Sequence, residues 1–298
     1  MRTIIIGTLL ISISFLSKSQ DNKIIVVDSL SNKPISYASA YFKNEKIGTY
    51  TNENGVFYYD KLDQIIQVSH IGYYSRIIKL PIKNDTVKMQ PHSYILNEII
   101  VKPSKRKVEI KGYYSFRSFF TISGHSGDEL AVYLPNNSDE NKFIKEIIIG
   151  FSTKQYIKNS LGIAFISIFR INLYSKKENS REPDSLLIKN DLVFTSDILK
   201  PETIINVSKY NLQMPKDGIF VSVEWIGIES TDTKKLITDY KNLIEPFVTT
   251  TFEKTQAVVY ERNKFKDVNW KLVDKNNKFS SALKKDNFYT PRISLSLY

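Results

Sequence analysis

The stretch IGTYTNENGVFYYD, Ile47 to Asp60, has two possible interpretations, a metal-binding loop or a turn between strands. Its oxygen-bearing side chains followed by Asn54-Gly55 are similar to a calcium loop. An EF-hand loop with Gly55 as its glycine, however, places Tyr50 at the first position and Lys61 at the twelfth, where the cation requires carboxylates. Asn-Gly between alternating strands is instead typical of a tight hairpin turn, because both residues tolerate positive φ. We interpret the stretch as a corner between strands, with calcium binding as the alternative.

Short apolar segments separated by turn residues extend in both directions from this corner. They recur about every 8–12 residues, which is typical of an all-β sandwich or barrel. No stretch repeats its apolar residues with a helical period over several turns. We therefore predict an all-β fold, with strands in KIIVVD at 23–28, ISYASAYFKN at 35–44, QIIQVSHIGYYSRIIKL at 64–80, FIKEIIIGFST at 143–153, GIAFISIFRINLYS at 162–175 and GIFVSVEWIGI at 218–228.

A basic segment divides the chain into two β domains. KPSKRKVEIKGYYSFRS, Lys102 to Ser118, contains a proline and a run of Lys and Arg, and its apolar pattern is broken, which indicates a connection between domains. A length of 298 residues suits two domains. In the second of them, IFVSVEWI is apolar on both faces, as expected of a central strand with one face in the core and the other under loops. The predicted order is a signal peptide at 1–19, a first β-sandwich at 20–103, a basic linker at 104–122 and a larger β-sandwich at 123–298.

The first residues, MRTIIIGTLLISISFLSKSQD, have the composition of a secretory signal peptide. Arg2 is the charged start, residues 4–16 are the apolar stretch, and Ser17 and Ser19 are small residues just before a cleavage point at Gln20. The apolar stretch is short for a bilayer span, although its retention as an anchor is the alternative. No cysteine follows, which excludes a bacterial lipoprotein anchor. We predict an exported protein, in the periplasm or associated with the outer membrane or cell surface, with no transmembrane segment after signal removal.

The composition excludes several kinds of function. Without cysteine the chain can form no disulfide, thiolate zinc site or cysteine nucleophile. The formal net charge is +11, and removal of residues 1–19 leaves +9, because Arg2 and Lys18 are lost and no acidic residue is. A basic surplus can indicate nucleic acid, an anionic membrane or an acidic glycan as partner. Here the basic residues are scattered and export argues against nucleic acid. We predict a solvated basic surface, no nucleic-acid partner and no cofactor.

The region from about Lys23 to Pro103 resembles a known family. Its ordered features are Asp28, Pro34, Ala38, Gly48-Thr49, TNENGVF at 51–57, VSHIGY at 68–73 and LNEIIV at 96–101. This order resembles the carboxypeptidase regulatory-like domain of exported Bacteroidetes proteins, which also stands at the N-terminus of many outer-membrane nutrient receptors. The resemblance implies a transthyretin-like, seven-stranded β-sandwich without catalytic residues.

The second region resembles the jelly-roll-like extension that accompanies this domain in some exported proteins. The resemblance rests on PDSLL at 183–187, INVSKYNLQMP at 205–215 and GIFVSVEWIG at 218–227, and it implies no activity. In receptors, a segment like LNEIIV precedes the region engaged by an inner-membrane energy-coupling protein. Here we expect residues 96–101 to form the last strand of the first sandwich, with strand addition to a partner as the alternative.

Three features of the sequence have both a catalytic or metal-binding interpretation and a structural one. GHSGDE at 124–129 resembles a serine-hydrolase elbow with Ser126 as nucleophile, but Asp128 stands where that motif needs glycine. The three histidines show no zinc-ligand spacing, and His70 is expected to face outward from a strand. The acidic pairs Asp128/Glu129 and Asp139/Glu140 are expected in polar loops, whereas a glycosidase needs two carboxylates across a cleft. We predict no catalytic residues and no metal ligands.

Exposed aromatic side chains are the candidates for carbohydrate binding. Trp225 lies within VSVEWIGI and is expected in the core, whereas Trp270 borders a polar turn in DVNWKLV. Packing on edge strands is the alternative role for the tyrosines. The candidate ligand-binding residues are Trp270, Tyr113, Tyr114, Tyr73 and Tyr74.

Together these features predict an exported, non-enzymatic cell-envelope protein that acts as a binding or scaffold module built from two β-sandwiches. Its expected partner is an envelope protein or a polysaccharide. A glycan-binding accessory protein of a nutrient-uptake system is the first alternative. A hydrolase with Ser126 as nucleophile is the second.

Overall fold

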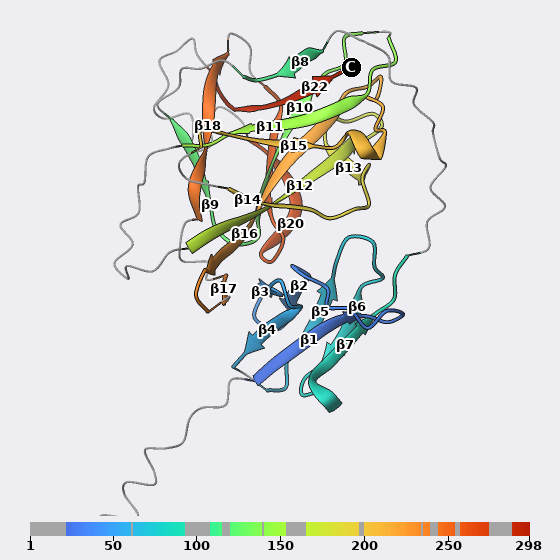
Figure 1. The fold of residues 1–298 in the computed structure, drawn as a ribbon, viewed down its shortest axis with the longest axis vertical. Helices are drawn as coiled ribbons and strands as arrows, with labels where there is room; N and C mark the ends of the chain where they lie inside the picture. Colours follow the sequence, from blue (N-terminus) through green and yellow to red (C-terminus); the bar gives the residue numbers. More distant parts are fainter. Residues whose placement is uncertain are drawn as a thin grey trace, which may run out of the picture.

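The protein consists of two β domains, which Figure 1 shows one above the other. The computed structural model describes residues 22–60, 62–92, 108–114, 120–138, 140–152, 165–196, 200–233, 235–238, 244–253, 257–273 and 288–298. Within these ranges the chain forms strands β1 to β22 and two short 3-10 turns, η1 (Lys83–Asp85) and η2 (Ser208–Tyr210), and no α-helix. The predicted signal peptide and the LNEIIV segment lie outside the described residues. No helix in the described part of the chain is long and apolar enough to cross a bilayer.

The first domain is a sandwich of seven strands, as predicted. One sheet has the order β4-β1-β7, and the other has the order β3-β2-β5-β6. The bounds are β1 Asn22–Asp28, β2 Ser39–Phe42, β3 Ile47–Tyr50, β4 Val56–Tyr59, β5 Ile65–Ser69, β6 Arg76–Lys79 and β7 Thr86–Met89. Alternate residues of these strands face each other across the core, among them Ile24, Val26, Ala40, Phe57, Ile66, Val68, Val87 and Met89, as expected of strands with one buried face.

The corner at Asn52–Gly55 is a backbone turn, as the sequence indicated. Asn52 Oδ1 accepts hydrogen bonds from the backbone N–H groups of Asn54 and Val56, both at 3.0 Å. Gly55 has φ 71°, and an added Cβ would lie 2.6 Å from the carbonyl oxygen of Val26. The predicted tight hairpin is wrong in one respect, because β3 pairs with β2 and β4 pairs with β1. The corner therefore carries the chain from one sheet to the other, and of the Asn-Gly pair only Gly55 has positive φ.

The second domain is built on a large sheet whose strands differ in length. Its main path has the order β13-β12-β16-β10-β19-β20, with β14 paired to β12 and β17 paired to β16. The bounds are β10 Asp128–Leu134, β12 Phe165–Lys176, β13 Pro183–Leu186, β14 Leu192–Ser196, β16 Ile219–Ser230, β17 Leu236–Ile237, β19 Val259–Asn263 and β20 Asp267–Leu272. β12 and β16 are the longest strands, and together they form the centre of this sheet.

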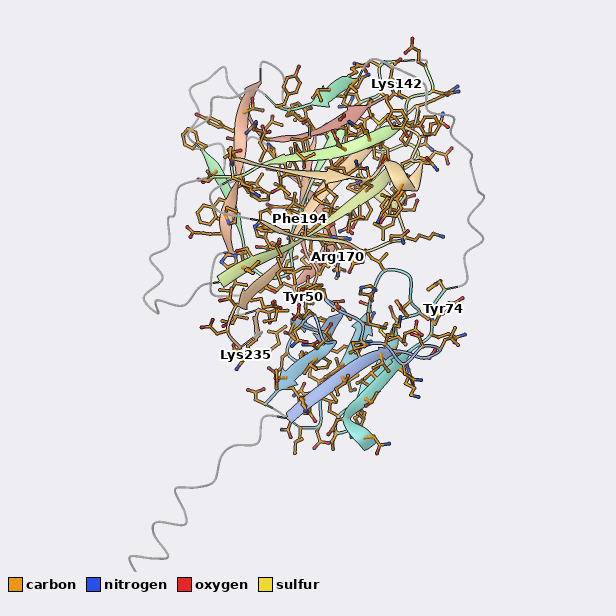
Figure 2. All side chains as sticks on the ribbon, viewed as in Figure 1. Tyr50, Tyr74, Lys142, Arg170, Phe194 and Lys235 are labelled. Atoms are coloured by element: carbon orange, nitrogen blue, oxygen red, sulfur yellow. The ribbon has the colours of Figure 1, made fainter. Side chains whose placement is uncertain are left out.

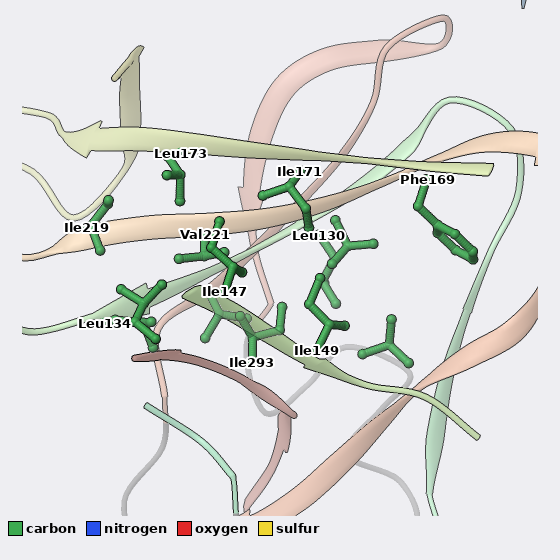
Figure 3. Packing of buried hydrophobic residues seen from close by; sticks show 14 of the residues in the cluster. Leu130, Leu134, Ile147, Ile149, Phe169, Ile171, Leu173, Ile219, Val221 and Ile293 are labelled. Carbon is green, nitrogen blue, oxygen red and sulfur yellow. The ribbon is translucent and has the colours of Figure 1, made fainter. Parts of the chain in front are cut away.

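Two smaller sheets cover the inner face of the large one. They have the orders β15-β11-β22-β8 and β21-β18-β9, and a bridge between Phe151 and Val248 joins them. The bounds are β8 Glu109–Gly112, β9 Thr121–Gly124, β11 Ile144–Gly150, β15 Glu202–Asn206, β18 Ile244–Glu253, β21 Phe288–Pro291 and β22 Ile293–Leu297. Leu130, Ile171 and Val221 of the large sheet pack against Ile147 and Ile293 of the smaller sheets (Figure 3). The second domain thus has a two-layer β core, consistent with the predicted fold class.

Part of the range expected to be a linker belongs to the second domain. β8 pairs antiparallel with β22 from Glu109 to Gly112, and β9 pairs with β18. The basic run at 104–107 lies outside the described residues. β8 was not predicted because Glu109 and Lys111 carry charge and because its pairing partner, β22, lies far along the chain. A strand held by backbone hydrogen bonds at a sheet edge needs no continuous apolar pattern.

Candidate functional site

A row of charged side chains crosses the outer face of the large sheet. Arg262 on β19, Glu129 on β10, Glu224 on β16 and Arg170 on β12 occupy directly opposed positions of neighbouring strands. Glu129 and Glu224 are 1% and 0% exposed, and Arg170 is 3% exposed. Because buried charges are costly unless they are paired and hydrogen-bonded, this row needs partners on every side.

The first domain supplies partners at the Arg170 end of the row. Tyr50, the last residue of β3, donates from its hydroxyl to Glu224 Oε1 at 2.7 Å. Arg170 donates to the carbonyl of Tyr37 at 2.7 Å and to Glu224 at 3.0 Å. Figure 2 shows Tyr50 and Arg170 close together where the two domains meet. The end of the charged row formed by Arg170 and Glu224 therefore lies in the domain interface.

Asp191 completes this end of the network. It accepts two hydrogen bonds from Arg170, at 2.5 and 3.0 Å. It also lies 2.9 Å from Nε2 of His70, which comes from the first domain. The prediction that His70 faces outward holds only for its own sandwich, because the side chain is 9% exposed once the second domain covers it. His70 is thus an interface residue.

The other end of the row is held within the second domain. Glu129 Oε1 accepts hydrogen bonds from Asn172, Tyr174 and Ser222, at 2.7, 2.8 and 2.6 Å. Glu129 Oε2 pairs with Arg262, whose Nε lies 2.8 Å away. This carboxylate was expected in a polar loop and is instead a fully bonded residue of a buried strand. Its lone pairs are occupied, so it is not available to an external substrate.

The same contacts keep the carboxylates ionised. Burial alone would raise the pKa of Glu129, but Arg262, Lys264 and the Ser222 hydrogen bond outweigh it and lower the pKa to about 2. Burial likewise opposes ionisation of Glu224, whose pKa is nevertheless lowered by Lys264 and Arg170. The pKa of Asp191 is held well below its usual range, because Arg170 and a hydrogen bond with His70 outweigh the effect of burial. Carboxylates that are kept ionised and paired in this way fix geometry and carry no proton to donate near neutral pH.

Apolar packing closes the interface around Phe265. This residue follows β19, is 4% exposed, and contacts the Tyr50 ring edge-on with 5.2 Å between centroids. The backbone of Gly48 lies so close that an added Cβ would be 2.1 Å from Phe265 Cδ1. Gly127 of the second domain approaches the same ring, and a Cβ added there would lie 2.5 Å from Phe265 Cδ2. Glycine on both sides therefore lets the Phe265 ring insert between the domains.

The first of these two domains matches a known family. Residues 25–101 match the family described as the CarboxypepD_reg-like domain. No curated protein and no solved structure matches the chain significantly. The match ends before the second domain begins, so it identifies the seven-stranded sandwich that contributes Tyr37, Tyr50 and His70 to the interface.

The predicted ligand-binding residues lie in three separate places. In the CarboxypepD_reg-like domain, Tyr73 donates to Asp28 at 3.0 Å, and Tyr74 is 52% exposed with its ring stacked 3.7 Å from that of His92. Tyr113 and Tyr114 follow β8 at the far end of the second domain (Figure 1). Tyr113 packs against the main core, and Tyr114 is 53% exposed. The structure does not bring these tyrosines together into one site.

Trp270 is the one candidate that touches the charged row. It lies on β20, partly buried, with the Arg262 guanidinium 4.1 Å from its ring centroid. The Tyr174 ring meets it edge-on at 5.5 Å. Trp225, expected in the core, is 1% exposed within the main apolar cluster of the second domain, which confirms that prediction. Trp270 therefore caps the Glu129 end of the network.

The elbow-like sequence around Ser126 has a structural role. Ser126 is 2% exposed, and its hydroxyl donates to the carbonyl oxygen of Ile226 at 2.6 Å. The neighbouring His125 points its Nδ1 at Asp128, 3.2 Å away. A nucleophilic serine needs a base within hydrogen-bond reach, and here the hydroxyl is bonded to the backbone of β16. Among the described residues no group of three or more His, Asp or Glu side chains could hold a metal ion.

The interface network is not predicted by the sequence patterns above, although one signal for it is present in the sequence. Arg170 and Glu224 each stand alone within a strand of apolar residues, SIFRINL and VSVEWIG. A charge at the centre of such a strand indicates a buried partner, because isolated buried charges are too costly. The sequence gives no indication of which strands lie side by side, so the partners could not be assigned.

Proposed function

We propose that this chain is an exported, non-enzymatic cell-envelope protein that acts as a binding or scaffold module. One observation carries the proposal: the side chains with the chemistry for catalysis are engaged in contacts within the protein, and two of them, Glu224 and Asp191, hold the CarboxypepD_reg-like domain on the second domain. Glu129 and Glu224 are buried, Asp191 is half-buried, all three are paired and ionised, and Ser126 is bonded to the backbone. A module whose two parts are held rigidly presents its outer surfaces in a constant arrangement, which suits binding and assembly.

The test combines turnover and capture. Purified protein is assayed with generic peptidase, esterase and glycosidase substrates, alongside a Ser126→Ala variant. No turnover above background is expected from either. Saturable turnover that Ser126→Ala abolishes would overturn the proposal. In parallel, the protein serves as bait for envelope extracts, and a partner retained by the wild type and identified directly supports the binding role.

A glycan-binding accessory role is the second candidate, and the position of Trp270 favours it. The indole is partly exposed on an edge strand, held by Arg262 on one side and Tyr174 on another. A fixed aromatic ring at the surface can stack on a sugar at little cost in conformational entropy. In affinity electrophoresis against a polysaccharide panel, Trp270→Ala should lose any retardation. Val268→Ala, a 60% exposed position on the same strand, is the matched control and should retain it.

A further inference from the structure

Strand β8 forms an open edge of the second domain. It is the last strand in the order β15-β11-β22-β8, and the described part of the chain places no strand beyond it. Figure 1 shows it at the end of the second domain that lies away from the first domain. Val108, just before β8, is 49% exposed, and Ile110 is 38% exposed. An edge strand with exposed apolar side chains can accept a further strand through its backbone groups.

The pairing with β22 determines which backbone groups of β8 face this edge. The two strands are antiparallel, and Tyr113 donates its backbone N–H to the carbonyl oxygen of Ile293 at 2.9 Å. Hydrogen-bonded and non-hydrogen-bonded positions alternate along such a ladder, so the backbone groups of Glu109 and Lys111 also point to β22. The N–H and C=O groups of Ile110, which lies between them, point to the open edge.

The two side chains that flank Ile110 carry opposite charges. Glu109 and Lys111 lie on the same face of β8, because side chains alternate along a strand. The Glu109 side chain is 41% exposed, and its Oε2 pairs with Lys142. The Lys111 side chain is only 15% exposed, and its Nζ lies 3.9 Å from Glu109 Oε1, which is too long for a hydrogen bond. A second carboxylate beside Lys111 would therefore be favourable.

We propose that β8 binds β8 of a second copy of this chain, antiparallel and about a two-fold axis at Ile110. The two Ile110 residues then exchange both of their outward backbone hydrogen bonds. Glu109 of each copy stands opposite Lys111 of the other, and such cross-strand pairs of opposite charge stabilise a sheet. Parallel pairing in register would instead place like charges side by side. The contact uses the same residues of both copies, as the interface of a symmetric dimer does.

The other edge of the same sheet lacks this charge complementarity and provides a matched control. Ile204 of β15 is 58% exposed. Val207 donates its backbone N–H to the carbonyl oxygen of Lys145 on the β11 side at 2.9 Å, so by the same alternation the backbone groups of Ile204 point outward. A two-fold axis at Ile204 would place Glu202 opposite Asn206, and no pair of opposite charges would form. We therefore expect the second copy at β8 and not at β15.

The experiment is sedimentation equilibrium of the purified protein over a range of concentrations. Because only a few residues pair, we expect a reversible dimer rather than a permanent one. Glu109→Lys and Lys111→Glu each place like charges opposite each other across the axis, and each should weaken the dimer at least about tenfold. An equimolar mixture of the two variants should associate again, because one edge is then basic and the other acidic. This recovery cannot come from a variant that fails to fold.

A proline at the centre of the strand tests the backbone contact. Ile110→Pro removes the N–H that faces the open edge and leaves the bonds to β22 in place, since proline is tolerated at such edge positions. It should abolish the dimer, whereas Ile204→Pro at the other edge should leave it unchanged, and thermal unfolding checks that both variants fold. The proposal is overturned by a wild type that stays monomeric at every concentration, by a dimer that survives Ile110→Pro, or by charge variants that do not associate when mixed.

Discussion

Among the described residues of the CarboxypepD_reg-like domain, Tyr50 is the one whose side-chain hydroxyl reaches the charged row. Its side chain is 1% exposed, and its hydroxyl donates to Glu224 at 2.7 Å. Tyr50→Phe keeps the ring and its contact with Phe265 but removes the donor, while Glu224 keeps its bond to Arg170. We expect the free energy of unfolding, measured by urea denaturation, to fall by about 1–2 kcal/mol. Tyr114→Phe, at a 53% exposed position, should change nothing, and equal effects of the two variants would contradict the assignment.

A substitution at Gly48 tests the apolar packing of the interface. A methyl group at this position would lie 2.1 Å from Phe265 Cδ1, so the ring must move or the domains must separate slightly. Gly48→Ala should lower the free energy of unfolding by about 1–3 kcal/mol, the usual cost of overpacking. Phe265→Leu makes room for the methyl group. In that background the same substitution should cost less, and an unchanged cost would show that the clash is not with Phe265.

At the scale of the strands, the cross-strand row explains why β12 carries an arginine in its apolar run. Arg170 lies between Glu224 and Asp191, and Arg170→Met would take away the guanidinium that pairs with both, so that Asp191 loses its arginine partner and Glu224 keeps Lys264 as its cation. We expect a loss of about 3–5 kcal/mol in unfolding free energy, because one partner of a buried ion pair is removed. Lys177→Met removes one half of the exposed Lys177–Glu182 pair and should cost less than about 1 kcal/mol. Similar losses for both would mean that the row contributes no more than surface pairs.

The strands were predictable where a single face is buried, and the interface was not. Alternation in KIIVVD and the Asn-Gly corner are local signals, so β1 and the turn at Gly55 follow from the sequence. β16 was expected to have one face under loops. That face instead carries Glu224 and meets Tyr50 from another domain, and no local pattern encodes which domain covers a strand. The edge strand β8 was missed for a related reason, because its partner β22 is the C-terminal strand.

At the scale of the whole molecule, the network makes the two domains depend on each other. Three residues of the first domain contact the charged network across the boundary: Tyr37, Tyr50 and His70. All three belong to segments on one side of the first sandwich. Folded domains joined by a buried, fully paired surface unfold together more readily than domains joined by a chain alone. The arrangement of the outer surfaces is then set by the interface, which is what a scaffold requires.

The same network predicts how stability responds to acid. Glu129, Glu224 and Asp191 have lower pKa values in the folded protein than in the unfolded chain, with Glu129 at about 2. At a pH between the folded and the unfolded pKa of one of these carboxylates, the unfolded state binds more protons than the folded state. The stabilisation is therefore complete above the unfolded pKa values of about 4 and is lost as the pH falls through the folded ones. The unfolding temperature should drop steeply between about pH 4.5 and 2.

A variant that removes one carboxylate of the row, Glu129, tests whether this acid response comes from the charged network. Glu129→Gln preserves the shape and one acceptor oxygen but cannot bind a proton in this range. Its unfolding temperature at neutral pH should be lower than that of the wild type, because Arg262 loses its buried counter-charge. Its further decline towards pH 2 should be shallower, because one of the three titrating groups is gone. Parallel curves for the two proteins would place the acid sensitivity elsewhere, in the exposed carboxylates that the interface does not use.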